Sequence, residues 1–187
     1  MALPDLRERL IDRFGRAGLA LYALAAGAFG LAACGVAAAA LRQPLLFPSL
    51  GPTVFLAFET PLQVEASPRN AVIGHLVGLT AGALSLALFG LPAEASALHT
   101  GVSAARIAAS VLALSLTGTV LLLVHAHHPP AGATTLIVSL GLVSVADGYL
   151  AIGSGVVLLM AVAWVVNRAC GVPFPLWSPR RAETLPE

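Results

Sequence analysis

Residues 17–41 read AGLALYALAAGAFGLAACGVAAAAL, an apolar run of 25 residues without a charged side chain. A helix needs about 20 apolar residues to cross the hydrocarbon core of a bilayer. The whole chain shares this character, because 58% of its 187 residues are hydrophobic and 10% are charged. In a soluble domain, charged residues make up about 25%. The composition predicts an all-α membrane protein and excludes a soluble or disordered one. The net charge of +1 argues against a nucleic-acid partner.

Six apolar segments follow one another along the chain. Four have the length of a transmembrane helix: 17–41, 70–91, 104–124 and 149–167. Two are shorter and are broken or opened by proline and glycine: 45–58 and 130–146. These two are either short tilted spans or half-helices that enter the bilayer and stop. We therefore predict a polytopic transmembrane helix bundle with four long spans and two short Pro/Gly-broken helices.

The two ends of the chain differ from this apolar middle. Residues 5–16 alternate charged and apolar side chains at helical spacing, which is typical of an amphipathic helix on a membrane surface. We assign residues 1–16 to an amphipathic cytoplasmic segment, 17–171 to the transmembrane domain and 172–187 to a cytoplasmic tail. The tail has four prolines from Pro173 onward, and we expect it to be loosely ordered.

Residues 31–34, LAAC, match the cleavage box of a lipoprotein signal peptide. A mature lipoprotein turns polar after its cysteine, whereas here the apolar run continues through Leu41. We therefore interpret the segment as an uncleaved first transmembrane helix in which Cys34 is a small packing residue.

The placement of arginine predicts the orientation in the membrane. If all six segments span, only Arg42 and Arg106 lie opposite the other eight arginines; if the two short segments re-enter, Arg42 and Arg69 do. Both counts put the termini on the arginine-rich side. We expect a multi-pass protein of a bacterial inner (plasma) membrane with both termini cytoplasmic.

The two halves of the chain resemble each other. A gap-free shift of 81 residues superimposes Pro48 on Pro129, Gly51 on Gly132, Thr53 on Thr134, Gly74 on Gly155 and Gly90 on Gly171. Each half then reads as a long helix, a broken short element and a long helix, which predicts two three-element repeats. Three spans per half would make the repeats inverted, and two spans with a re-entrant piece would make them parallel. Paired broken elements point to a transporter site.

The most specific local feature is residues 125–134, HAHHPPAGAT. Proline suits the first turn of a helix, so a helix is predicted to begin within 129–131. Its first N–H groups, which lack intrahelical acceptors, and its dipole favour an anion; these groups belong to Ala131, Gly132, Ala133 and Thr134. Residues 47–53 offer Ser49, Gly51 and Thr53 in the same way. The alternative is that proline and glycine only shape short, tilted helices.

Polar side chains in or beside the apolar segments complete the candidate site. His75 lies inside a span, so it should face protein or water, and His128 is the histidine that we expect to function through a proton or an anion. Arg69, beside Asn70, opposes a helix dipole, so we expect it to have an anion or another partner, unless it only extends to the interface. No carboxylate or cysteine accompanies the histidines, and we expect no metal and no cofactor.

Gly74, Gly78 and Gly82 lie on one helix face, which predicts close helix packing, within the chain or in a homo-oligomer. The sequence contains no nucleophile–base set, no paired carboxylates and no phosphate-binding loop with its lysine. We therefore expect that the protein is not an enzyme.

Three ordered blocks resemble a known family. They are residues 49–53, SLGPT; residues 68–70, PRN, with Gly74 and His75; and residues 128–134, HPPAGAT. Over about residues 42–167 they are similar to the HPP family of integral membrane proteins. Members usually have four transmembrane helices, and plant plastid and cyanobacterial members are associated with nitrite transport. In this chain Pro52 stands where members commonly have a small residue such as alanine.

The resemblance implies a membrane transporter or channel for nitrite or a similar small monovalent anion. Two alternatives remain open: a neutral small-solute or weak-acid channel, and a structural or regulatory membrane protein that transports nothing. Histidines satisfied by the backbone in a closed interior would favour the last. The candidate substrate-binding residues are Ser49, Gly51, Thr53, Arg69, Asn70, His75, His128, Ala131, Gly132, Ala133 and Thr134.

Overall fold

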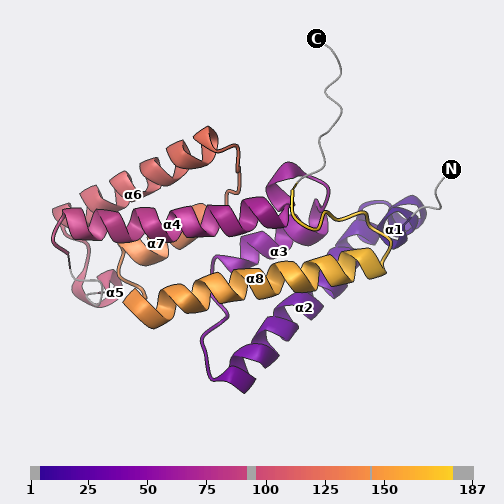
Figure 1. Ribbon diagram of the computed structural model, residues 1–187. Helices are drawn as coiled ribbons and strands as arrows, with labels where there is room; N and C mark the ends of the chain where they lie inside the picture. Colours follow the sequence, from indigo (N-terminus) through magenta and orange to yellow (C-terminus); the bar gives the residue numbers. More distant parts are fainter. Residues whose placement is uncertain (1–4, 92–95, 144, 179–187) are drawn as a thin grey trace, which may run out of the picture.

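The computed structural model describes residues 5–91, 96–143 and 145–178. Within these residues all regular elements are helices and no strand occurs (Figure 1). Four helices are long and apolar enough to cross a membrane, which confirms the predicted long spans. They are α2 (Arg16–Leu41), α4 (Pro68–Leu88), α6 (Ala104–Leu123) and α8 (Val145–Ala169). The shorter elements are α1 (Leu6–Phe14), α3 (Leu50–Glu59), η1 (Val64–Ala66), α5 (Ala97–Thr100) and α7 (Ala131–Ser139).

Local caps explain where several helices begin. α1 starts with a capping box, in which the Asp5 carboxylate accepts from the Glu8 N–H and the Glu8 carboxylate accepts from the Asp5 N–H. Ser67 caps α4 by accepting from the Asn70 N–H, and Pro68 occupies the first turn. Ser103 caps α6 in the same way. The first residues of these three helices are therefore set by hydrogen bonds between residues close in the sequence.

The long helices alternate in direction. The start of α1 lies beside the end of α8, because the Leu6 N–H donates to the Cys170 carbonyl at 2.9 Å. The start of α4 lies there too, because the Arg69 N–H donates to the Trp177 carbonyl at 3.1 Å. Hence α2 and α4 run away from this end of the bundle, and α6 and α8 run toward it (Figure 1). We call it the α1 end, and the opposite end, where α5 lies, the α5 end.

The two broken segments settle how the chain crosses the bundle. α3 has 10 residues and α7 has 9, which give lengths of about 15 and 14 Å, too short to span a bilayer alone. Each begins inside the bundle after a non-helical stretch, 42–49 or 124–130. α3 ends at the α1 end, where the Arg7 guanidinium donates to the Glu59 carbonyl. α7 ends at the α5 end, where the Arg106 guanidinium donates to the Ser139 carbonyl.

Each broken segment thus completes a pass between the two ends, with only half of the pass helical. The positions of Arg69 at the α1 end and Arg106 at the α5 end agree with the alternative in which all six segments cross, while the crossing of a bilayer by the two short segments stays a prediction. Arg180 and Arg181, which entered the orientation count, lie outside the described residues.

Contacts between the halves match one another. α3 packs on α2 and α8, as α7 packs on α6 and α4, and α2 contacts α8 as α6 contacts α4. A Cβ on Gly74 would meet Ala131 at 3.3 Å, and one on Gly155 would meet Leu50 at 3.6 Å; the shift of 81 residues relates these pairs. The contacts are those that an inverted repeat requires, while the superposition of the halves stays a prediction.

The glycine face of α4 packs against α7 within the chain. A Cβ on Gly78 would lie 2.8 Å from the Ala131 carbonyl oxygen, and one on Gly82 would lie 2.7 Å from Val138 Cβ. The predicted close packing is therefore confirmed. Because α7 fills this face, the face is not available to a second copy of the chain.

A second core joins α2, α3 and α8. Tyr22 donates its hydroxyl to Asn167 Oδ1 at 2.9 Å, and Asn167 Nδ2 donates to the Ala57 carbonyl at 3.0 Å. Cys34 is fully buried in this core, as expected of a packing residue. Phe174 is 2% exposed in the same core. The expected loose order from Pro173 is therefore wrong for Phe174, because its ring finds an apolar site beside α8; residues 179–187 lie outside the described residues.

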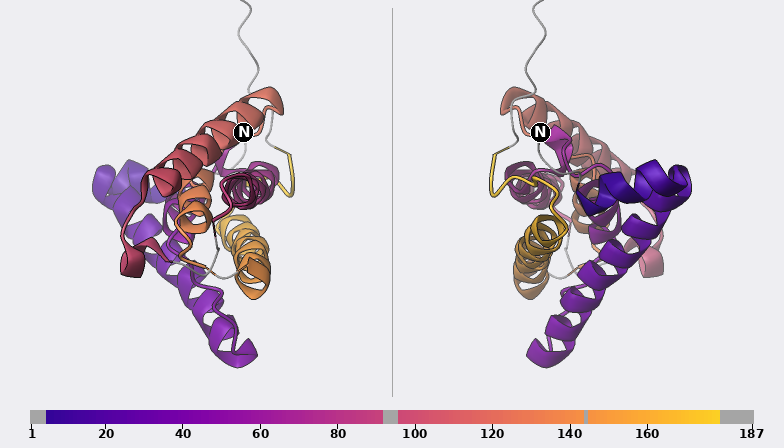
Figure 2. Two further views of the ribbon diagram at one scale, coloured as in Figure 1. Left: turned by 90° about the vertical axis from the view of Figure 1, so that its left-hand side faces the viewer. Right: turned by 90° about the vertical axis from the view of Figure 1, so that its right-hand side faces the viewer.

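The C-terminal end of α2 projects away from the other helices (Figure 2). Its side chains there include Val36, 70% exposed, and Leu41, 64% exposed. Apolar exposure of this kind is expected on a surface that lipid covers.

Candidate functional site

Four buried polar side chains meet where the two half-helices begin. They are Thr53 of α3, His75 of α4, Thr134 of α7, and His128, which precedes α7. We call them the histidine–threonine cluster. Each side chain is at most 1% exposed. All four are among the residues predicted from the sequence, and the fold brings them together.

The cluster is joined by short contacts. Thr53 Oγ1 lies 3.1 Å from His75 Nε2 and 3.3 Å from His128 Nε2, and the two Nε2 atoms lie 3.3 Å apart. His75 Nδ1 lies 2.6 Å from Thr134 Oγ1. The imidazole rings meet edge to face, with centroids 5.0 Å apart. The hydroxyls from the two half-helices thus contact opposite nitrogens of one imidazole.

The backbone around His128 positions its ring. His128 Nδ1 donates to the Glu65 carbonyl at 2.8 Å. Asn70 Nδ2 donates to the Val64 and His127 carbonyls at 3.1 and 3.3 Å. Asn70 therefore links η1 to the non-helical stretch that carries His128. Glu65 is not among the residues predicted from the sequence, because a backbone carbonyl leaves no signal in residue type.

Arg69 has a partner in the protein. Its guanidinium donates to the carbonyls of His125 and Val124 at 3.0 and 3.2 Å, and to Asn70 Oδ1 at 3.0 Å. These carbonyls follow the last turn of α6, where a cation interacts favourably with the helix dipole. We expected either an anion or another partner for Arg69. The structure shows the second, in the form of two backbone carbonyls and the Asn70 side chain.

The N-terminal N–H groups of both half-helices are already paired, which corrects the expectation that they are free donors. In α7, the N–H groups of Ala131, Gly132 and Ala133 donate to the carbonyls three residues earlier at 3.0, 3.0 and 3.1 Å. In α3, Leu50 and Gly51 do the same at 2.9 and 3.3 Å. Bonds of the i→i+3 type are frequent in the first turn of a helix, and proline is favoured in the second position of such a turn, where Pro48 and Pro129 lie. The side chains of the cluster, rather than the backbone, supply the hydrogen-bonding atoms.

The remaining predicted residues surround the cluster without joining it. Ser49 is fully buried at the N-cap of α3, and its hydroxyl has no hydrogen-bond partner in the described part of the chain. Ala131 packs against Gly74 and Gly78. A Cβ on Gly51 would meet open space.

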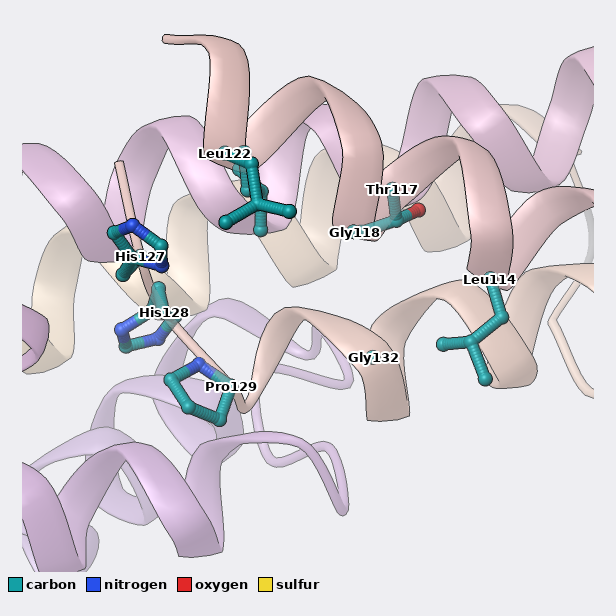
Figure 3. Close-up of a pocket in the computed structure, with 9 residues that line it drawn as sticks. Leu114, Thr117, Gly118, Leu122, His127, His128, Pro129 and Gly132 are labelled. Carbon is teal, nitrogen blue, oxygen red and sulfur yellow. The ribbon is translucent and has the colours of Figure 1, made fainter. Parts of the chain in front are cut away.

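Two surface grooves flank Pro129. The first, of about 330 Å³, lies between α6 and α7 (Figure 3). Its lining is Leu114, Thr117, Gly118, Leu121, Leu122, His127, His128, Pro129 and Gly132. The second, of about 420 Å³, lies between α3 and α7 and includes Pro52, Glu59 and Ala133. His128 lines the first groove although its side chain is almost fully buried, so the groove reaches the edge of the cluster.

The chemistry of the cluster is that of neutral hydrogen bonding and proton exchange. No hydrogen bond links a carboxylate to either imidazole among the described residues, and no group of three His, Cys, Asp or Glu there could hold a metal ion. Two hydroxyls and two imidazoles can each donate or accept. Such a cluster can rearrange its hydrogen bonds around a small polar solute.

Comparison with known proteins bears on the whole bundle. The family model for the HPP transmembrane region matches residues 14–175. The comparisons with curated proteins and with solved structures give no match. The matched residues include the histidine–threonine cluster and all six passes, from α2 to α8. The chain therefore belongs to the HPP family of membrane proteins.

Proposed function

We propose that this protein is a transporter or channel for nitrite or a similar small monovalent anion, and that the anion binds at the histidine–threonine cluster. One observation carries the proposal: two half-helices begin inside the bundle and direct Thr53 and Thr134 to the same imidazole, His75. Both positive dipole ends converge there. Donors at such a position replace the hydration of an anion without a buried lysine.

The proposed orientation places the α1 end in the cytoplasm. This end holds six arginines among the described residues: Arg7, Arg9, Arg13, Arg16, Arg69 and Arg168. The opposite end holds Arg42 and Arg106. An excess of arginine marks the cytoplasmic side of bacterial membrane proteins, and the inner membrane is the location that we propose.

Nitrite uptake into proteoliposomes tests the function. The vesicles contain an internal nitrite sensor, and uptake is measured at fixed pH over a range of imposed membrane potentials. Saturable uptake above that of empty liposomes is expected, with loss in His128→Ala. His99→Gln is the control, because His99 is an exposed histidine on α5, outside the cluster and both grooves. Uptake equal to that of empty liposomes would overturn the proposal.

The closed state of the cluster favours a second candidate, a structural or regulatory membrane protein. His128 is satisfied in part by the Glu65 backbone, and all four cluster side chains are buried. Buried polar groups with full hydrogen bonding also serve packing specificity alone. Under this alternative no solute moves, and replacing His128 changes thermal stability without any transport phenotype. Uptake that depends on the membrane potential would indicate passage of the anion alone. Uptake that ignores the potential would indicate a neutral solute, a weak acid or an anion that crosses together with a proton.

A further inference from the structure

The hydrogen-bond directions in the cluster determine how many protons it holds. The Glu65 carbonyl can only accept, so His128 Nδ1 carries a hydrogen. Neutral His128 then presents a bare Nε2 toward His75 and Thr53. A bare nitrogen needs a donor, and the His75 Nε2 and the Thr53 hydroxyl are the groups within 3.3 Å.

Neutral His75 has two tautomers, and one of them satisfies this requirement fully. In that one, His75 Nε2–H points to His128 Nε2, the Thr134 hydroxyl donates to His75 Nδ1, and the Thr53 hydroxyl donates to the Ser49 carbonyl at 3.1 Å. In the other, His75 Nδ1–H donates to Thr134 Oγ1, and the Thr53 hydroxyl would have to leave the Ser49 carbonyl to reach one of the two bare Nε2 atoms. One proton therefore shifts across the His75 ring without any change in the total number.

The pair has room for one further proton. It would occupy the gap between the two Nε2 atoms, where one ring donates to the other, while both Nδ1 atoms donate to Thr134 Oγ1 and the Glu65 carbonyl. A second extra proton would place two imidazolium N–H groups against each other across 3.3 Å. Like charges at that distance strongly disfavour double ionisation.

An added proton lacks a directly bonded counter-charge. The charged or titratable side chains on α3, η1, α4 and residues 124–130, besides the pair itself, are Glu59, Glu65, Arg69, His125 and His127. Glu65 interacts electrostatically with His128, but its hydrogen bond to the ring comes from its backbone carbonyl. None of the other four is hydrogen-bonded to either ring in the described structure. Arg106 of α6 donates to the Ser139 carbonyl at the α5 end, and Arg168 lies in the last turn of α8. An uncompensated charge in this apolar interior is costly.

We infer that the cluster binds the anion together with one proton, which is held between His75 and His128. The inference rests on the proposed anion transport and specifies its coupling. A proton alone and an anion alone are each unfavourable at a buried site, whereas the two together are neutral. Each therefore raises the affinity of the site for the other, as linkage requires. The loaded site is electroneutral, and the proton and the anion cross together.

Calorimetric titration of the purified protein with sodium nitrite tests this inference. At one pH above neutrality, the titration is repeated in buffers that differ in ionisation enthalpy, which yields the number of protons taken up per nitrite bound. A value near one is expected. The apparent nitrite affinity should also fall about tenfold for each unit rise in pH. His99→Gln, at an exposed histidine on α5, should keep both properties, and His128→Gln should bind nitrite more weakly with no proton uptake.

The outcomes separate this inference from the function on which it rests. Nitrite binding without proton uptake would overturn the coupling and leave anion transport standing. No nitrite binding by the wild-type protein would remove the proposed function, and the coupling with it. The proton number is measured on the wild-type protein, so the test does not depend on whether a histidine variant folds.

Discussion

His75 Nε2 and His128 Nε2 lie 3.3 Å apart, although the residues are separated by 53 positions. Gly74 makes this approach possible, because a Cβ at that position would lie 2.9 Å from His128 Cβ. His128 can therefore approach the backbone of α4 this closely because position 74 has no side chain. The histidine pair depends on a glycine that forms no hydrogen bond with either ring.

Gly74→Ala should displace His128 and disrupt the pair. Overpacking of a buried contact costs about 1–3 kcal/mol, so the melting temperature in detergent should fall and nitrite uptake should be lost. Gly153→Ala is the control, because a Cβ there meets nothing within 4 Å and alanine has the higher helix propensity. Equal melting temperatures for the two variants would contradict the close approach at Gly74.

Thr53→Val should impair the site more than Thr53→Ser. Valine keeps the shape of threonine but removes the hydroxyl that contacts both histidines. An unsatisfied buried group costs about 1–3 kcal/mol, whereas serine retains the hydroxyl. Thermal unfolding and nitrite uptake measure both effects. If serine and valine behave alike, the hydroxyl has no role in the cluster.

Arg69→Lys should lower stability and nitrite uptake as Arg69→Gln does. The guanidinium donates to the carbonyls of Val124 and His125 at once, and the single ammonium of lysine cannot reproduce this planar geometry. We expect both variants to destabilise the α4–α6 contact by about 1–3 kcal/mol. Rescue of both stability and uptake by lysine would show instead that Arg69 acts through its charge alone.

Gly132→Leu should slow nitrite uptake while the fold is kept. A side chain at this position fills the groove beside His128 and meets Leu114 Cδ1 at 3.3 Å. Leu114 is 43% exposed, so it can move aside at small cost. Anion-dependent quenching and uptake are compared with those of Gly153→Leu, whose side chain enters open space. Unchanged flux and affinity would remove the start of α7 from the site.

The sequence predicts the parts of this fold that depend on neighbouring residues. Apolar runs long enough for a bilayer predict α2, α4, α6 and α8, and the paired proline and glycine segments predict α3 and α7. Spacing of four residues places Gly74, Gly78 and Gly82 on one face for close packing. These features are local because helix formation, proline geometry and helical periodicity act within a few residues.

The tertiary structure decides what the polar residues contact. Only the fold shows that Arg69 caps α6 and that the Glu65 carbonyl holds His128. It also shows that the N–H groups at the start of α7 are already paired. Thr53, His75, His128 and Thr134 form one cluster because six passes bring α3, α4 and α7 together. Distances between residues more than 20 positions apart depend on helix packing and cannot be predicted from residue type alone.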